Sequence, residues 1–313
     1  MNIKQEIKDF ALSIGFSQIG FARAEALDVE FINYMDSLKS GFNGSMKYLE
    51  KNLAQKQNPL EILPEAKTVI VAAWNYFVPV YHPKDGFGKI SRYAWGKDYH
   101  ITIKNKLKLV SEKIQGIVPG SENRIFCDSN SVLEKAWAVR AGIGWQGKNC
   151  LILNKKFGSF FFLGIIITSV YLEPDKRPED NHCGDCRLCI EACPTNALRE
   201  PGVLDSRKCI SYWSIEEKNI PFPASISENL NGWIYGCDIC QDVCPWNRGK
   251  AISKDFSFME GSAKSVIEPE TVLTMNKDAF FDRFSATAVI RAGLEKLKEN
   301  AQVLVANKKN KSG

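Results

Sequence analysis

The amino-acid sequence predicts an α+β protein, in which a layered N-terminal domain of helices and strands precedes a cysteine-rich domain and a short helical end piece. Helix-like and strand-like segments alternate as far as residue 175, and the residues after 250 have mainly helical patterns. Eight of the ten cysteines lie between Cys183 and Cys244, which sets the middle of the chain apart. We therefore expect domains at 1–175, 176–250 and 251–313.

The first domain contains five apolar segments rich in β-branched and aromatic residues, which are typical of strands. Helical patterns separate them unevenly, which favours a layered α/β arrangement over a helical bundle. The charged, proline-containing segment EPDKRPEDNH, 173–182, is the expected linker to the next domain. The expected strands are 17–22, 68–77, 122–128, 150–154 and 159–170, and the expected helices are 2–14, 29–40, 99–117 and 131–142.

Composition indicates an ordinary globular protein, with 44% hydrophobic and 25% charged residues among 313. The N-terminal segment reads as an amphipathic helix without the apolar core of a signal peptide. The longest uncharged run, Phe157 to Leu172, is short for a membrane span and suits a buried strand better. We expect a cytoplasmic protein that does not contact a membrane. A net charge of +5 permits nucleic-acid binding but does not by itself indicate it.

The first cysteine run, HCGDCRLCIEACPTNAL, has the spacing C-x2-C-x2-C-x3-C-P. This spacing is typical of bacterial ferredoxins with two [4Fe–4S] clusters, in which the fourth cysteine of a run binds the other cluster. The middle domain is therefore expected to be ferredoxin-like. The four cysteines are Cys183, Cys186, Cys189 and Cys193, followed by Pro194.

The second run, YGCDICQDVCPWN, lacks its opening cysteine but keeps Cys237, Cys240 and Cys244 before a proline. Cys209, between the two runs, is the candidate for the missing ligand, because a longer loop costs closure entropy only slowly. If the cysteine before proline in each run binds the cluster of the other run, two ligand sets are predicted. One is Cys183, Cys186, Cys189 and Cys244, and the other is Cys193, Cys209, Cys237 and Cys240.

Two structural zinc sites or disulfides are the alternatives for these eight cysteines. Zinc sites usually pair two C-x2-C knuckles, and the clustering of cysteines in a chain without an export signal argues against disulfides. Cys127 and Cys150, outside the runs, are expected to be buried thiols. The glycines of AGIGWQGKN, 141–149, form G-x-G-x-x-G, but a helix precedes them and a strand follows, which is the reverse of a dinucleotide site.

The segments CDSNSVLEKAWAVRAGIGWQGKNCLI, SRYAWGKDYH and LPEAKTVIVAAWNY, together with the two cysteine runs and RKCISYW, resemble the epoxyqueuosine reductases. The resemblance covers nearly the whole chain. It implies reduction of an epoxide to an alkene on the modified wobble base of tRNA, the last step of queuosine synthesis. It also implies cobalamin, two [4Fe–4S] clusters, an unidentified low-potential electron donor and a monomer.

By this resemblance, Asp128 is the acid that protonates the leaving epoxide oxygen and also lies against cobalamin. A carboxyl that is partly removed from water between cofactor and substrate is expected to have a raised pKa. The residues alone instead favour Asp128 as the cap of the helix expected from Ser131, since Asp, Ser and Asn cluster there and Glu134 follows.

The resemblance also places cobalamin in the N-terminal domain, against the strands that follow Lys148. DYHITI, from Asp98, begins like a D-x-H-x-x-G motif, but Ile103 stands at the glycine position. Without that source of a histidine ligand, we expect cobalamin to bind base-off. The expected contacts are Lys56, Ile152, Leu163, Ile166, Ser211 and Asp238, besides Asp128.

Two other functions fit the sequence. One is a cobalamin-dependent reductase of another small substrate, similar to a dehalogenase. The other is a non-catalytic iron–sulfur carrier that passes electrons to a corrinoid protein, which predicts clusters without bound cobalamin. Substitution of Asp128 would leave such a carrier unaffected.

Overall fold

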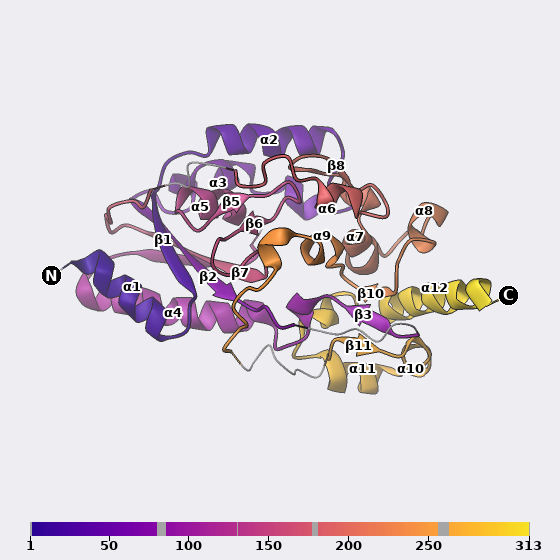
Figure 1. The fold of residues 1–313 in the computed structure, drawn as a ribbon. Coiled ribbons are helices and arrows are strands. Elements are labelled where there is room, and N and C mark those ends of the chain that lie inside the picture. The colour runs from indigo at the N-terminus through magenta and orange to yellow at the C-terminus, as the bar shows by residue number, and fades with distance from the viewer. Residues whose placement is uncertain (1, 80–85, 130, 177–180, 256–262, 313) are drawn as a thin grey trace.

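Figure 1 shows the fold in a computed structural model, which describes residues 2–79, 86–129, 131–176, 181–255 and 263–312. All ten cysteines fall within these ranges, and each has a free thiol. Within the described residues, no helix is both long and apolar enough to cross a membrane.

The main sheet has four antiparallel strands in the order β1-β2-β7-β4. Its two central strands are β2 (Thr68–Asn75), which is buried throughout, and β7 (Phe161–Thr168), which is nearly so. The edge strands are β1 (Gln18–Arg23) and β4 (Asn123–Phe126). The long uncharged run of the sequence therefore forms a central strand, as expected, because both of its faces are covered.

Helices cover both faces of this sheet (Figure 1). On one side, α1 (Ile3–Ser13) and α4 (Tyr99–Ile117) pack over the face that contains Ile70. On the other, α5 (Glu134–Arg140) packs over the face that contains Val71, with α2 (Asp28–Lys39) and α3 (Leu53–Gln57) outside it. Full burial of each large apolar side chain contributes about 1.5–3 kcal/mol, so these two cores hold the layers together.

A short hairpin of β5 (Trp145–Gln146) and β6 (Ile152–Leu153) follows α5 and contains the G-x-G-x-x-G glycines. At Gly144, a Cβ atom would lie 2.0 Å from the carbonyl oxygen of Leu153. Gly142 has a φ of 73°, in the left-handed region that favours glycine. These glycines let the backbone turn and approach a strand, and α5 before them and β6 after them confirm the order of elements that the sequence predicts.

Replacing Gly144 with alanine is expected to destabilise the chain by about 2 kcal/mol or more, because the backbone must move away from Leu153. Gly116 in α4 is the matched control, since a Cβ there meets nothing within 4 Å. Gly116→Ala should stabilise by about 0.5–1 kcal/mol. Thermal unfolding of both variants tests this expectation, and similar midpoints would contradict it.

A second, three-stranded sheet joins segments that are far apart in the sequence. Its central strand is β3 (Gly88–Ile90), with β10 (Trp233–Tyr235) parallel on one side and β11 (Val266–Ile267) antiparallel on the other. One core links Ile90 to Tyr235 and to the C-terminal Phe284. The cysteine-rich segment is therefore held between the N-terminal and C-terminal parts of the chain.

Asp175, in the expected linker, pairs with Lys4 at 2.6 Å and accepts a hydrogen bond from the Phe21 amide. Residues 177–180 of that linker lie outside the described residues.

The remaining elements are short except at the C-terminal end, where the expected helices are confirmed. The other helices are α6 (Leu188–Glu191), α7 (Ile210–Ile215), α8 (Ala224–Ser227), α9 (Ile239–Asp242), α10 (Pro269–Thr274), α11 (Lys277–Phe284) and α12 (Leu294–Ser312). The other strands are β8 (Leu198–Glu200) and β9 (Val203–Leu204), and the 3-10 turns are η1 (Lys47–Glu50), η2 (Pro59–Glu61), η3 (Arg92–Ala94), η4 (Ser206–Lys208), η5 (Pro245–Asn247) and η7 (Ala288–Arg291).

Candidate functional site

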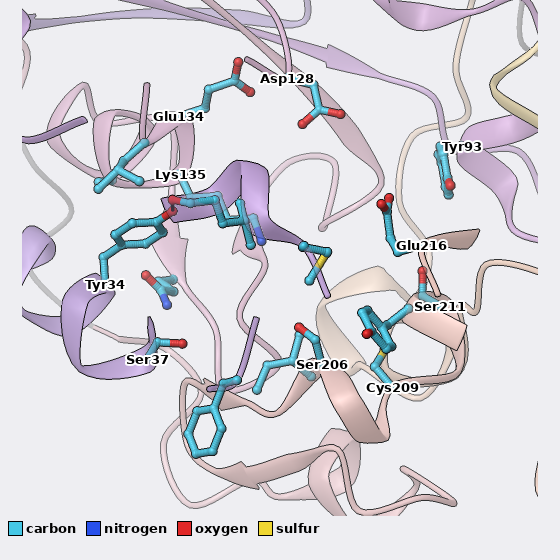
Figure 2. Close-up of a pocket in the computed structure, with 18 of the residues that line it drawn as sticks. Tyr34, Ser37, Tyr93, Asp128, Glu134, Lys135, Ser206, Cys209, Ser211 and Glu216 are labelled. Carbon is cyan, nitrogen blue, oxygen red and sulfur yellow. Dashed lines mark hydrogen bonds between the residues drawn. The ribbon is translucent and has the colours of Figure 1, made fainter. Parts of the chain in front are cut away.

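A cavity of about 1630 Å³ lies where β2 and β4 end and β7 begins. Tyr76 and Asp128, just beyond the ends of β2 and β4, line it from the main sheet. Cys209 and Ser211 line it from the cysteine-rich segment, and Arg291 lines it from the C-terminal part. Figure 2 shows Asp128 on one side of the cavity, with Cys209 and Ser211 across from it. Three parts of the chain thus build one site.

The first set of thiols surrounds Cys189. Burial raises the pKa of this thiol, and the neighbouring thiols of Cys244, Cys183 and Cys186 raise it further. Cys183 and Cys244 also share a small apolar cluster with Trp145. These four cysteines are the members of the first predicted ligand set. The fold therefore brings Cys244 close to the three cysteines of the first run.

The second set surrounds Cys237. Burial raises the pKa of this thiol, and the thiols of Cys209 and Cys193 raise it as well. Cys240 is affected in the same direction by burial and then by Cys237 and Cys209. Cys209, which is displaced in the sequence, therefore lies with the second set and also faces the cavity.

Among the described residues, no three His, Cys, Asp or Glu side chains are arranged to hold a single metal ion.

Asp128 follows β4 with a φ of 49°, a left-handed conformation that aspartate tolerates better than most residues. Its Oδ2 atom accepts hydrogen bonds from the Tyr99 hydroxyl at 2.6 Å and from His100 Nε2 at 3.2 Å. Its side chain remains 60% exposed because it lies on the wall of an open cavity. Two converging donors mark this carboxyl as an ionised acceptor.

The expectation of a raised Asp128 pKa is wrong for this structure. Removal from water by the surrounding protein raises the pKa, but the hydrogen bonds from His100 and Tyr99 outweigh it and lower the value to about 2. The alternative role as a helix cap is also wrong. Helix α5 begins at Glu134, and its N-cap position is Leu133 with no side-chain cap.

His100, at the start of α4, links two carboxyls, those of Asp98 and Asp128. Its Nδ1 atom lies 2.7 Å from Asp98 Oδ1, and its Nε2 atom faces Asp128. Burial lowers the pKa of His100, but the bonds to Asp128 and Asp98 raise it to about 9. The imidazole is therefore protonated at neutral pH beside an ionised Asp128.

Glu134 is another carboxyl in the cavity wall, and Figure 2 shows it beside Asp128. Its Oε1 atom is buried without a hydrogen-bond partner. Burial, followed by repulsion from Asp128, raises the pKa of Glu134 to about 8. At neutral pH the site therefore holds a neutral carboxylic acid next to a carboxylate.

Two of the other residues predicted to contact a cofactor line the cavity. Lys56 is buried, its Nζ atom donates to the Lys51 carbonyl, and burial lowers its pKa. Its amine lies 5.8 Å from the centre of the Tyr34 ring, which is also in the cavity wall. Ser211 faces the cavity next to Cys209.

Four predicted contacts do not line this cavity. Strand alternation directs Ile166 into the core beneath α1 and α4 and Leu163 toward the opposite face, so one bound group cannot touch both side chains. Ile152 is buried in the second of these cores. Asp238 is buried and bonded to Ser91 Oγ at 2.6 Å and to the Arg92 guanidinium at 3.1 Å.

Sequence reasoning missed most of the residues that surround Asp128. It rejected the D-x-H-x-x-G motif that contains His100, and it took Glu134 only as support for a cap. Tyr99 and Arg291 were not considered. A usable signal was the Asp-Tyr-His triplet at a helix start, because a capping Asp98 orients the residue two positions later.

Two sets of four thiols lie beside a large cavity that contains the Asp128–His100 pair. This combination is typical of an iron–sulfur oxidoreductase. The chain is 43% identical to the epoxyqueuosine reductase of Synechocystis sp. over 84% of its own length and 90% of the relative. It is 38% identical to that of Cellulophaga algicola, covering 97% of this chain and all of the other. The chain belongs to the epoxyqueuosine reductase family.

Family models and solved structures agree with this membership. The model described as "Epoxyqueuosine reductase QueG, DUF1730" matches residues 56–129, and that described as "4Fe-4S double cluster binding domain" matches 182–247. The epoxyqueuosine reductase of Streptococcus thermophilus superposes with a TM-score of 0.90 at 33% identity, over 98% of this chain and 82% of the other. A crystal structure of an epoxyqueuosine reductase with an epoxyqueuosine-modified tRNA stem loop gives 0.91 at 29%, over 99% and 82%.

Proposed function

We propose that this protein reduces epoxyqueuosine to queuosine in tRNA and that the cavity beside Asp128 is its active site. The epoxide oxygen leaves as water and an alkene remains, so each turnover consumes two electrons and two protons. The observation that carries the proposal is the arrangement of the cavity. A hydrogen-bonded carboxyl, Asp128, faces a wall that contains Cys209 of the second thiol set.

The electrons require the two clusters, which carry them one at a time. We assign the ligands as predicted from the spacing, since the thiols gather into the same two sets. The set with Cys209 is next to the cavity and is therefore the one that passes electrons to the reaction. The assigned sets are Cys183, Cys186, Cys189 and Cys244, and Cys193, Cys209, Cys237 and Cys240.

The cavity also suits cobalamin, which, when bound, would supply the redox-active cobalt centre for this reduction. Its volume of about 1630 Å³ exceeds that of an ordinary small-molecule pocket, about 300–1,000 Å³, and leaves room for both a macrocycle and a base. Lys56 and Ser211 would contact the bound group. His100 lines the cavity, but both ring nitrogens face carboxylates, so it is not free to be a lower ligand, which supports base-off binding.

The substrate base must leave the anticodon loop to enter this cavity. Tyr34, Tyr48 and Arg291 in the wall offer the aromatic and guanidinium surfaces on which unstacked bases pack. The Arg291 guanidinium itself lies 5.6 Å from the centre of the Tyr48 ring. A tRNA substrate also supports a cytoplasmic location. We expect a monomeric enzyme that is reduced by an unidentified low-potential donor.

Asp128 has the position to deliver a proton to the epoxide oxygen. The hydrogen bonds from Tyr99 and His100 fix the direction of its carboxyl. Protonation makes the oxygen a better leaving group, and a positioned acid contributes typically ~10²–10⁴-fold to such a step.

Nucleoside mass spectrometry after anaerobic turnover tests the proposal. Protein with both clusters, cobalamin and a low-potential reductant is mixed with tRNA that contains epoxyqueuosine. We expect a product that lacks one oxygen, no product without cobalamin, and a rate at least ~100-fold lower for Asp128→Asn.

The matched control is Asp278→Asn, because Asp278 is exposed on α11 and does not line the cavity. It should turn over at the wild-type rate. Absence of product from fully loaded wild-type protein would refute the function, and equal rates for the two asparagine variants would refute the role of Asp128.

A further inference from the structure

Asp98, Tyr99 and His100 form the start of α4, and Tyr99 and His100 also contact Asp128. Starting a helix does not require these contacts. Asp98 caps α4 by accepting a bond from the His100 amide at 2.9 Å, and the same Oδ1 atom lies 2.7 Å from His100 Nδ1. The opposite ring nitrogen lies 3.2 Å from Asp128 Oδ2. The ring stacks on Tyr99 at 4.1 Å between centroids, which fixes its plane.

This geometry specifies the protonation state of the imidazole. Ionised carboxylates only accept hydrogen bonds, so a ring with a carboxylate at each nitrogen must donate from both. The nearby charges agree, because the bonds to Asp128 and Asp98 raise the pKa of His100 by more than burial lowers it. The proton at neutral pH therefore lies on His100 and not on Asp128.

Other charged groups around the ring do not change this assignment. Lys104, on α4, acts on Asp98, and Arg291, from the C-terminal part, acts on Asp128. Glu134, on α5, interacts with His100 and is mostly neutral at pH 7; once it ionises above about pH 8, its negative charge holds the proton on His100 more tightly. The buried thiol of Cys127 has a raised pKa and is neutral too, as is the phenol of Tyr99.

We propose that His100 stores the proton that Asp128 delivers to the substrate. The Nε2–H bond breaks as an O–H bond forms on Asp128, and that bond breaks in turn as the proton reaches the departing oxygen. The ring becomes a neutral imidazole that keeps its Nδ1 proton on Asp98. Water in the open cavity then reprotonates Nε2, and two such cycles supply the two protons of one turnover.

His100 acts through Asp128 and is thus a positioning residue that also holds the proton. The electrons come from the clusters, so this path moves protons only. The inference rests on the proposed function, because it concerns the acid of that same reaction.

The first test is a direct titration of His100. The chain has three histidines, so ¹⁵N-histidine labelling of the loaded, oxidised protein gives few NMR signals, and His100→Gln identifies the one from His100. We expect that signal to titrate near pH 9 in the wild type and at a lower pH in Asp128→Asn, where only the bond to Asp98 still raises the pKa of His100. Titration of the wild-type signal at or below about 6.5 would overturn the inference.

The second test is the pH profile of single-turnover reduction. The wild-type rate should fall as pH rises through about 9 and His100 loses its proton. In His100→Gln, where the amide can still donate to Asp128 but does not titrate, the rate should fall ~100-fold and lose this alkaline limb. Asp98→Asn keeps a capping side chain but lacks the charge, so it should move the limb to lower pH.

Cobalamin absorption and iron content measured on each variant separate this role from a structural one, and both should match the wild type. A His100→Gln profile that keeps its alkaline limb would overturn the inference while leaving the proposed function intact. If the wild type gives no product, the proposed function fails, and the inference fails with it whatever the NMR titration gives.

Discussion

Cys209→Ala is expected to remove one complete cluster and with it all turnover. Cys209 is the one ligand of the second set that lies outside the two cysteine runs, yet its thiol interacts with those of Cys193 and Cys237. A cubane that has lost one of four thiolates is exposed to solvent at that corner, next to the cavity. Iron should fall from about eight to about four atoms per chain.

Cys150→Ala is the matched control for this experiment. Cys150 is also a largely enclosed free thiol that senses Cys209 electrostatically, but it belongs to neither set. It should retain about eight irons and normal turnover. Iron analysis, with electron paramagnetic resonance of the reduced protein, measures both variants. Equal iron contents would show that the second cluster has a different fourth ligand.

Arg92→Met is expected to destabilise the loaded protein by about 3–5 kcal/mol, because it leaves a buried carboxylate without its cation. The Arg92 Nη1 atom lies 3.1 Å from Asp238, which is 1% exposed, and 2.7 Å from Asp242. The Arg92 amide also donates to Asp238 at 2.9 Å. Since Asp238 lies between Cys237 and Cys240, the same variant should lose iron faster from the second cluster.

Arg124→Met provides the comparison, because Arg124 forms an exposed pair with Glu122 at 3.1 Å. Exposed pairs contribute about 0–1 kcal/mol, so this variant should unfold close to the wild type. Anaerobic urea unfolding, followed by tryptophan fluorescence and by cluster absorption, gives the two midpoints. A shift for Arg92→Met no larger than that for Arg124→Met would mean that the buried pair contributes little.

Local patterns were sufficient to predict the main elements of the N-terminal part. The run from Phe157 to Leu172 and the helix at 99–117 each carry a strong period or a continuous apolar stretch, and both are confirmed as β7 and α4. The small sheet of β3, β10 and β11 was not predicted. Its strands are two or three residues long, and their pairing depends on contacts between distant segments.

The iron–sulfur ligands were the most predictable part of the site, because cluster chemistry requires cysteines at short fixed spacings. Even the displaced Cys209 could be inferred from the number of ligands that two clusters need. Strand alternation alone places Leu163 and Ile166 on opposite faces of β7, so the sequence already argued against a shared contact. Only the tertiary structure shows which core covers each face.

The sequence by itself determined the two-cluster domain and the family resemblance, and through that resemblance it proposed Asp128 as the acid, since all of these depend on residue identity and spacing. Only the tertiary structure decided the charge of that acid. A pKa depends on which donors lie within a few ångströms, and His100 and Tyr99 reach Asp128 from a helix that starts 29 residues earlier in the chain. The fold thus places a charged imidazole beside a carboxylate for which the resemblance had implied a raised pKa.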